Sequence, residues 1–218
     1  MRVHLPNSAF LGNIDPFLRS VDYSEPESLE ITANEKWLAL HPMALCMLSA
    51  LGLTVGPSRV RWDKLSQDAR LYLERMGLFQ LLKIPTGIET ADREPAGRFI
   101  PLTQIKNPGE LTQCISQLVP LLQLDPKHAE PVMYIISELI GNVLEHSQSK
   151  AGAILSAEYT KKSNSIRIAV ADSGVGIRET INQSYITASD LDAIKLALWP
   201  GITGTSEREG GTERNGGA

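Results

Sequence analysis

The spacing of apolar side chains in the first third of the chain predicts alternating strands and helices. Residues 28–33 alternate polar and apolar side chains, as a half-buried strand does, and residues 3–5 and 60–62 are shorter strand candidates. Residues 42–51 are almost wholly apolar, so we expect a helix packed against a sheet and ended by Gly52. This alternation favours a small α/β layer structure.

Two further helices are predicted from their starting residues. Asp15 precedes Pro16, which predicts a helix over residues 15–21 with Asp15 as its N-cap and Pro16 at its first position. Ser66 precedes an amphipathic stretch that continues to residue 73, so we expect Ser66 to cap a second helix.

The second part of the chain shows a clearer order of elements. Its apolar spacing predicts a strand at residues 99–105, helices at 109–124 and about 126–146, and strands at 154–159 and 166–171. Asp125 and Pro126 supply a cap and a first-turn proline for the second helix, and a polar turn joins the last two strands as a hairpin. A glycine-rich loop follows the hairpin.

A break in composition separates the two parts. Residues 85–97 combine proline, glycine and charged side chains between apolar segments, which is typical of a linker. The chain has 218 residues, enough for one large domain or two small ones. We therefore expect two domains, over residues 1–84 and 98–218, joined by residues 85–97.

The long predicted helix places two oxygen-bearing side chains side by side. The apolar side chains of residues 132–144, Ile135 and Leu139 among them, fill one arc of a helical wheel, and Tyr134, Glu138, Gly141, Asn142 and Glu145 fill the opposite arc. Glu138 and Asn142 are four residues apart and therefore neighbours. A carboxylate and an amide oxygen are ligands that Mg²⁺ accepts, whereas the alternative is simply a solvated polar face.

The loop after the hairpin, Asp172-Ser-Gly-Val-Gly-Ile177, ends a strand in a carboxylate and two glycines. The glycines allow a sharp turn and leave the backbone open to a ligand. Asp172 could accept a hydrogen bond from an amino group such as that of adenine, or it could instead bond its own backbone in a tight turn. The loop matches neither a dinucleotide-binding fingerprint nor a phosphate loop.

Together the two motifs resemble those of the histidine-kinase-like (GHKL) ATPases. Glu138-Leu-Ile-Gly-Asn142 is similar to the N box of that superfamily, and Asp172-Ser-Gly-Val-Gly176 to its G1 box. The resemblance spans about residues 98–218 and is closest to the anti-sigma-factor serine kinases, whose version of the helix also ends in a histidine, here His146. It implies a Bergerat-type ATP-binding α/β sandwich.

The same resemblance implies a role for each matching residue. Asn142 would coordinate Mg²⁺, Glu138 would be the catalytic or water-positioning carboxylate, and Asp172 would bind the adenine amine. The remaining residues that it assigns to the nucleotide pocket are Gly174, Gly176, Ile177 and Thr205. The expected cofactors are therefore ATP and Mg²⁺.

Two features depart from the family pattern. Glu145 occupies the position where many relatives carry Lys or Arg near the phosphates. Residues 201–218 are similar to a mobile ATP lid, and the sequence ends where the family's G2 box would begin, so we expect a sandwich that is incomplete at its C-terminus. A Gly-rich polar tail is the alternative for these last residues.

The first part of the chain resembles STAS-like domains, the fold of anti-sigma-factor antagonists. The resemblance rests on residues 41–52, which are similar to the strand-to-helix junction of that fold, and on residues 72–77, which are similar to its next surface helix. It implies a small α/β domain over about residues 1–84. At the helix start where antagonists carry a phosphorylatable Ser, this chain has His41 and Pro42.

Composition narrows the class of protein. Lys plus Arg number 21 and Asp plus Glu 25, a formal charge of −4, and the absence of a basic cluster argues against nucleic-acid binding. The one long uncharged stretch, at residues 37–58, is interrupted by proline and glycine, so we expect no membrane-spanning segment. The first residues lack the apolar core of a signal peptide. We therefore expect a cytoplasmic protein that is not bound to a membrane. Cys46 and Cys114 lie in apolar helical patterns, which favours buried free thiols.

We therefore expect an ATP·Mg²⁺-binding regulatory protein that acts in signal transduction. We expect its partner to be a regulatory protein. The chain itself could be a monomer or a homodimer. As a GHKL ATPase or a protein serine/threonine kinase of the anti-sigma type, it would use Glu138 to assist transfer of the γ-phosphoryl group. The first alternative is a non-enzymatic switch in which nucleotide binding changes contacts with a partner. A second is an interaction module that binds no nucleotide.

Overall fold

A computed structural model describes residues 1–9, 12, 14–34, 39–63, 65–86, 99–122, 126–160, 163 and 165–202. The strands are β1 (Arg2–Leu5), β2 (Ser8–Ala9), β3 (Leu29–Ala33), β4 (Ala39–Leu40), β5 (Val60–Asp63), β6 (Phe99–Ile105), β7 (Ala153–Thr160) and β8 (Ser165–Ala171). The helices are α1 (Ile14–Arg19), α2 (Pro42–Val55), α3 (Gln67–Arg75), α4 (Leu78–Leu81), α5 (Pro108–Leu122), α6 (Pro126–His146), α7 (Gly176–Ile181) and α8 (Asp190–Ala197). The protein is a mixed α/β fold, which confirms the predicted class at that level.

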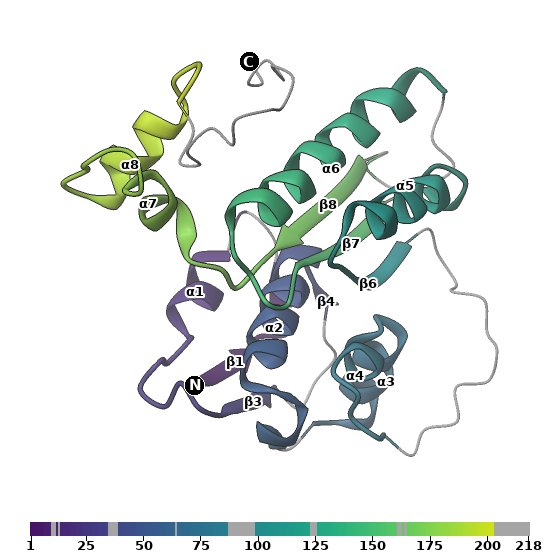
Figure 1. The fold of residues 1–218 in the computed structure, drawn as a ribbon. Helices are drawn as coiled ribbons and strands as arrows, with labels where there is room; N and C mark the ends of the chain where they lie inside the picture. Colours follow the sequence, from purple (N-terminus) through teal and green to yellow (C-terminus); the bar gives the residue numbers. More distant parts are fainter. Residues whose placement is uncertain are drawn as a thin grey trace.

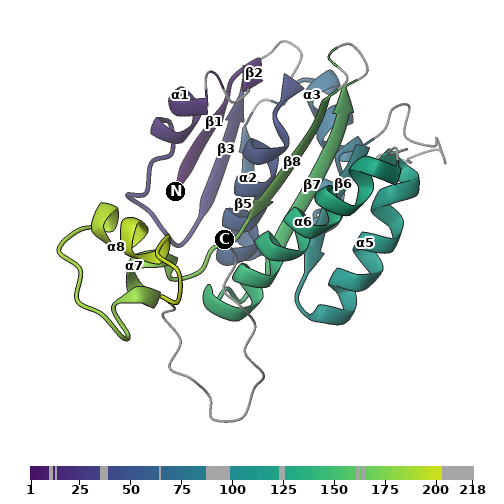
Figure 2. The same ribbon diagram turned by 90° about the horizontal axis from the view of Figure 1, so that it is seen from above.

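The elements stack in alternating layers of sheet and helix. The two three-stranded sheets are a parallel sheet, in the order β1-β3-β5, and an antiparallel sheet, in the order β6-β7-β8. Strands β2 and β4 form a separate two-stranded parallel sheet. Figure 2 shows α2 between the two sheets, with α5 and α6 on the opposite face of the antiparallel sheet. Figure 1 shows α5 and α6 side by side on that face, and α7 and α8 beyond the end of β8. This arrangement places the start of the glycine loop and the end of α6 at one end of the antiparallel sheet.

Helix α2 is apolar on all sides because both of its faces are covered. Leu45, Cys46 and Leu48 have no exposed surface, and burying each leucine stabilises the fold by about 2 kcal/mol. The thiol of Cys46 donates to the carbonyl oxygen of Ala169 on β8, 3.6 Å away, and burial raises the pKa of this thiol. Cys46 and Cys114 are free and buried, as predicted.

A single buried cluster connects the two sheets through α2. It contains residues of the first part of the chain, such as Val3, Ile31 and Leu45, and residues of the second part, such as Ile154 and Ala169. The hydrophobic core therefore runs across the composition break at residues 85–97, of which the structure describes only the first two. No helix in the described residues is both long and apolar enough to cross a membrane.

Two predicted helix boundaries are wrong. Helix α2 continues through Gly52 to Val55 and is followed by Gly56 at a φ of 86°. Gly52 is inside the helix because a Cβ there would lie 2.8 Å from the side chain of Leu82, so it serves close packing rather than termination. Helix α1 starts at Ile14, which places Asp15 inside the first turn rather than at the N-cap.

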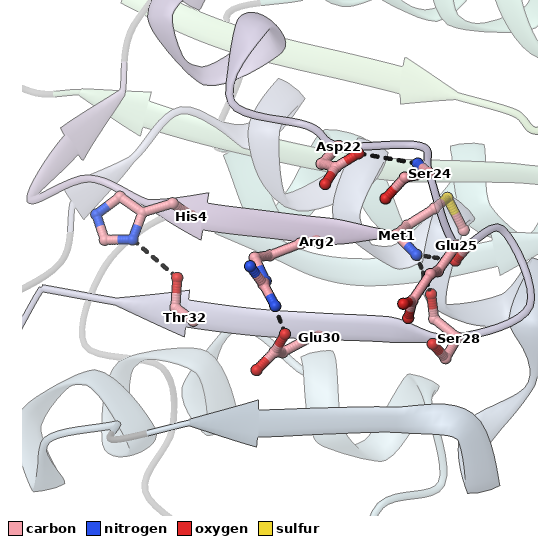
Figure 3. A network of polar contacts seen from close by, with 9 residues as sticks. All are labelled: Met1, Arg2, His4, Asp22, Ser24, Glu25, Ser28, Glu30 and Thr32. Carbon is pink, nitrogen blue, oxygen red and sulfur yellow. Dashed lines mark hydrogen bonds and ion pairs between the residues drawn. The ribbon is translucent and has the colours of Figure 1, made fainter.

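The outer face of the parallel sheet is polar. Arg2 and Glu30 form an ion pair at 2.7 Å, and His4 lies 2.8 Å from the hydroxyl oxygen of Thr32, as Figure 3 shows. The neighbouring side chains Val3 and Leu5 point to the opposite face and have no exposed surface. Only one face of this sheet therefore contributes to the core. The same view shows the Met1 amino group beside the backbone carbonyls of Glu25 and Ser28.

His41 caps α2 from a buried position. Its Nδ1 accepts a hydrogen bond from the backbone N–H of Met43 at 3.1 Å, which requires an unprotonated nitrogen. Only 5% of the residue is exposed. Burial and, to a smaller extent, the positive charge of Arg167 lower the pKa of this imidazole below its ordinary value of 6.5.

The lowered pKa of His41 predicts a loss of stability in acid. The unfolded chain binds a proton near pH 6.5 while the folded chain does not, so the free energy of unfolding should fall as the pH drops below 6.5, and should stop falling below the folded-state pKa. Urea denaturation at pH 7.5 and 5.0 measures this difference. His41→Asn keeps a capping side chain without a titrating group, so its stability should change less between the two pH values. An equal change in both proteins would contradict the prediction.

Candidate functional site

Helix α6 exposes the two residues that carry the N-box resemblance. Ile136 and Ile140 are fully buried against the antiparallel sheet, whereas Glu138 and Asn142 are exposed on the other side of the helix. Neither side chain forms a hydrogen bond or an ion pair with another described residue. Gly141 lies between them, and a Cβ there would meet nothing within 4 Å. The polar face of α6 is thus exposed, which is compatible both with a ligand site and with the solvated polar face that the sequence also allowed.

The apolar arc of α6 is broader than its buried face. The helical wheel places Ile135 and Leu139 with the core residues, but 50% of Ile135 and 43% of Leu139 are exposed. Together with Tyr134, which is 57% exposed, they form an uncovered apolar strip along the helix. The apolar arc of the helical wheel is therefore only partly buried, because the sheet covers only the side of the helix around Ile136 and Ile140.

The glycine loop forms the tight turn that the sequence analysis considered as an alternative. Oδ1 of Asp172 accepts a hydrogen bond from the backbone N–H of Gly174 at 2.7 Å. Asp172 is exposed, so its second carboxylate oxygen can still accept a bond from a ligand. The turn and a binding role for Asp172 are therefore compatible.

The loop is fastened to the C-terminal end of α6 through Ser147. The backbone N–H of Val175 donates to the Ser147 carbonyl oxygen at 2.8 Å. A Cβ at Gly174 would lie 2.0 Å from that same oxygen, closer than two such atoms can approach, so only glycine fits. The glycine loop, some thirty residues further along the chain, therefore lies at the end of the helix that carries Glu138 and Asn142.

Three hydroxyl groups that sequence reasoning missed strengthen this junction. The Ser149 hydroxyl oxygen accepts from the backbone N–H of Ser173 at 3.4 Å, and the Ser147 hydroxyl oxygen accepts from the Ser149 N–H at 3.0 Å. The Thr180 hydroxyl lies 3.2 Å from the carbonyl oxygen of His146. Small hydroxyl side chains have no periodic pattern, so the only available signal was their position directly after the helix and loop motifs.

Beyond the loop, the chain presents exposed apolar side chains. Gly176 starts α7 with a φ of 81°, a conformation that glycine adopts without strain. Ile177 is 51% exposed and Val175 is 42% exposed. Such side chains could pack against a flat ring. Thr205, the remaining predicted nucleotide-binding residue, lies outside the described residues.

The structure brings the motifs together through the backbone rather than through their functional side chains. No contact joins the side chains of Glu138 or Asn142 to that of Asp172 in the described residues. No group of three His, Cys, Asp or Glu side chains gathers there either. Two neighbouring oxygen donors fit Mg²⁺ only when phosphate oxygens and waters complete its six ligands, which is how this ion usually binds.

A cleft of about 600 Å³ lies on the side of the glycine loop that faces the first part of the chain. It is lined by Leu53, Thr54, Pro57, Leu81, Lys83, Gln104, Lys106, Gln148, Lys150, Ala151, Ser173, Gly174 and Val175. Of the predicted site residues it includes Gly174 but not Glu138, Asn142 or Asp172. Sequence reasoning missed this cleft because its lining comes from five separate segments.

The junction at Ser147 predicts unequal effects for substitutions at the two loop glycines. Gly174→Ala would force a methyl group into the Ser147 backbone and should destabilise the fold by about 2–3 kcal/mol. Gly176→Ala has open space and faces only the strain of its positive φ, about 1 kcal/mol. Urea denaturation of both variants measures the difference. A larger loss for Gly176→Ala would disprove the packing argument.

No protein-family model matches the chain, and no curated protein or solved structure matches it either. The GHKL and STAS-like resemblances therefore rest on the motifs quoted above and on the geometry around them.

Proposed function

We propose that this protein is an ATP·Mg²⁺-binding regulatory protein of the GHKL type. One observation carries the proposal: Glu138 and Asn142 are exposed one helical turn apart on α6, with no partner among the described residues, and the Asp172 loop is bonded to the end of that helix. A helix, a hairpin and a glycine loop follow one another in the family's order. Within the α/β fold, we propose that the second part of the chain is a Bergerat-type sandwich and that the first part is a STAS-like domain.

Each side chain can perform the role that the resemblance implies. The amide oxygen of Asn142 is free to hold Mg²⁺, which would offset the charge of the nucleotide phosphates when bound. The carboxylate of Glu138 is free to orient a hydroxyl group or a water molecule. Oδ2 of Asp172 can accept from the adenine amine while Oδ1 keeps its bond to Gly174. Ile177 and Val175 offer apolar surface to the ring.

The glycine loop suits adenine better than phosphate. The backbone N–H groups of Ser173, Gly174 and Val175 all donate within the protein, to Ser149, Asp172 and Ser147 respectively. A phosphate loop instead needs free N–H groups that point at the ligand. Phosphate contacts must therefore come from α6, Mg²⁺ or other parts of the chain.

Such a site is compatible with two activities, which differ in the role of the Glu138 carboxylate. In a protein serine/threonine kinase or ATPase, Glu138 assists attack on the γ-phosphate by a partner hydroxyl or by water. In a non-enzymatic switch, bound nucleotide only changes contacts with a regulatory partner, and Glu138 is dispensable. The uncovered strip of Tyr134, Ile135 and Leu139 beside the site favours contact with another protein surface.

ATP·Mg²⁺ should raise the thermal stability of the wild-type protein. At a hundredfold excess over Kd the gain is about 3 kcal/mol, and Asn142→Ala should remove most of it. Glu138→Gln should keep the thermal shift but lose ATP turnover, which phosphate release or transfer to a partner measures. Glu130→Gln, an exposed glutamate at the far end of α6, is the matched control and should behave as wild type.

The outcomes separate the alternatives. No thermal shift with wild type would refute the nucleotide site and leave an interaction module. A normal shift with equal background turnover in wild type and Glu138→Gln would refute the enzyme and favour the switch. A shift that Asn142→Ala does not reduce would place the nucleotide elsewhere on the protein.

A further inference from the structure

The 600 Å³ cleft beside the glycine loop has a charge unlike that of the chain as a whole. Lys83, Lys106 and Lys150 line it, and none of its lining residues is acidic. None of the three lysines forms an ion pair with any carboxylate in the described ranges. The formal charge of the whole chain is −4, so this concentration of unpaired positive charge is local. An anion is the ligand that such a lining attracts.

Two helices end at the same place. Lys83 and Gln148 have φ values of 54° and 55°, and they are the only non-glycine residues with positive φ in the described chain. Lys83 follows α4, where its N–H donates to the carbonyl of Gln80 and the N–H of Ile84 donates to that of Phe79, a common way to end a helix. Gln148 follows α6. Both residues line the cleft, so these helix ends bring an ammonium group and an amide to it.

Two features oppose an anion, and both are weaker than the lysines. The C-terminal end of α2 lies at the cleft, and its carbonyl groups act as about half a negative charge. The three lysines outweigh it with three positive charges. The N–H groups of Ser173, Gly174 and Val175 are already bonded within the protein and add no donors. Attraction of an anion therefore depends on the lysine side chains.

The rest of the lining is mixed: Thr54, Gln104, Gln148 and Ser173 are polar, and the other side chains are apolar. Leu53, Pro57, Leu81 and Val175 contribute carbon surface beside the lysines. A volume of about 600 Å³ is within the range of small-molecule sites in proteins. A ligand that fills it would combine an apolar body with a charged group.

We propose that this cleft binds a small organic phosphate, with its doubly charged group held by Lys83, Lys106 and Lys150 and its apolar body against Leu53 and Leu81. This site is distinct from the proposed ATP site, which lies along α6. The two sites share the glycine loop, since Gly174 lines the cleft while its N–H bonds to Asp172. The cleft site does not depend on ATP binding at α6.

Phenyl phosphate is a suitable probe because it joins one ring to one phosphate dianion. In titrations of the full chain followed by isothermal calorimetry and by amide NMR shifts, it should bind saturably and shift amides of residues 53–57, 81–84 and 147–151. Replacing all three lysines, as Lys83→Gln, Lys106→Gln and Lys150→Gln together, should weaken binding by about tenfold or more. Lys195→Gln removes an exposed lysine on α8 that is remote from the cleft and should leave binding unchanged.

Several results would overturn the proposal. The first is an absence of saturable binding, and the second is equal binding by the wild type and the triple variant. The third is equal affinity for phenyl phosphate and inorganic phosphate, which would show that the apolar lining contributes nothing to binding. Circular dichroism checks that the triple variant is folded, which is expected because all three lysines are exposed. Titration with ATP separates the two sites: loss of ATP binding in the triple variant but not in Asn142→Ala would support this cleft and refute the site on α6.

Discussion

The burial of helix α2 between two sheets is the interaction on which the rest of the structure depends. The parallel sheet has a polar outer face and the antiparallel sheet already carries α5 and α6, so each has one apolar face left to cover. Helix α2 packs between both faces, and α4 adds to the cover of the parallel sheet through the contact of Phe79 with Trp62 on β5. Because burial of apolar surface is the main favourable term in folding, this shared contact joins the first and second parts of the chain into one core.

The candidate site takes its geometry from a second apolar cluster, in which α6 packs on the opposite face of the antiparallel sheet. The buried side of α6 packs on the antiparallel sheet, and β8 is a strand of that sheet. The end of α6 and the end of β8 therefore lie close together, and the carbonyl of Ser147 contacts Gly174 and Val175. The polar side of α6 and the glycine loop are therefore positioned by packing beneath them rather than by contacts with each other. The lysine cleft forms where α2, α4 and β6 end beside the same loop, so the same loop borders two sites of different chemistry.

Much of this could be predicted from apolar periodicity. Strand β6 has the predicted bounds, and β1, β3, β5, β7, β8 and the long helices were found within a few residues, because each buries one regular face. Strands β2 and β4 and helices α4 and α7 were missed because two to six residues are too short for a periodic pattern. Helix α8 was missed as well, since Ala193 is its one buried residue and its apolar pattern is correspondingly weak. The polar face of α6 was found for the same reason as its core face, whereas the position of Ile135 depends on where the sheet stops. The lysine cleft could not be predicted, since Lys83, Lys106 and Lys150 are far apart in sequence and meet only in the folded chain.

The double coverage of α2 has a consequence for how this protein tolerates mutation. A surface helix has a face on which substitutions are nearly neutral, but α2 has none along most of its length, because a larger side chain on either side meets a sheet. The small residues Ala44, Ser49 and Ala50 are explained by this limit, and Ser49 satisfies its own hydroxyl by donating to the carbonyl of Leu45. Variation in either half of the chain must therefore remain compatible with the same helix, so the two halves are constrained to evolve together.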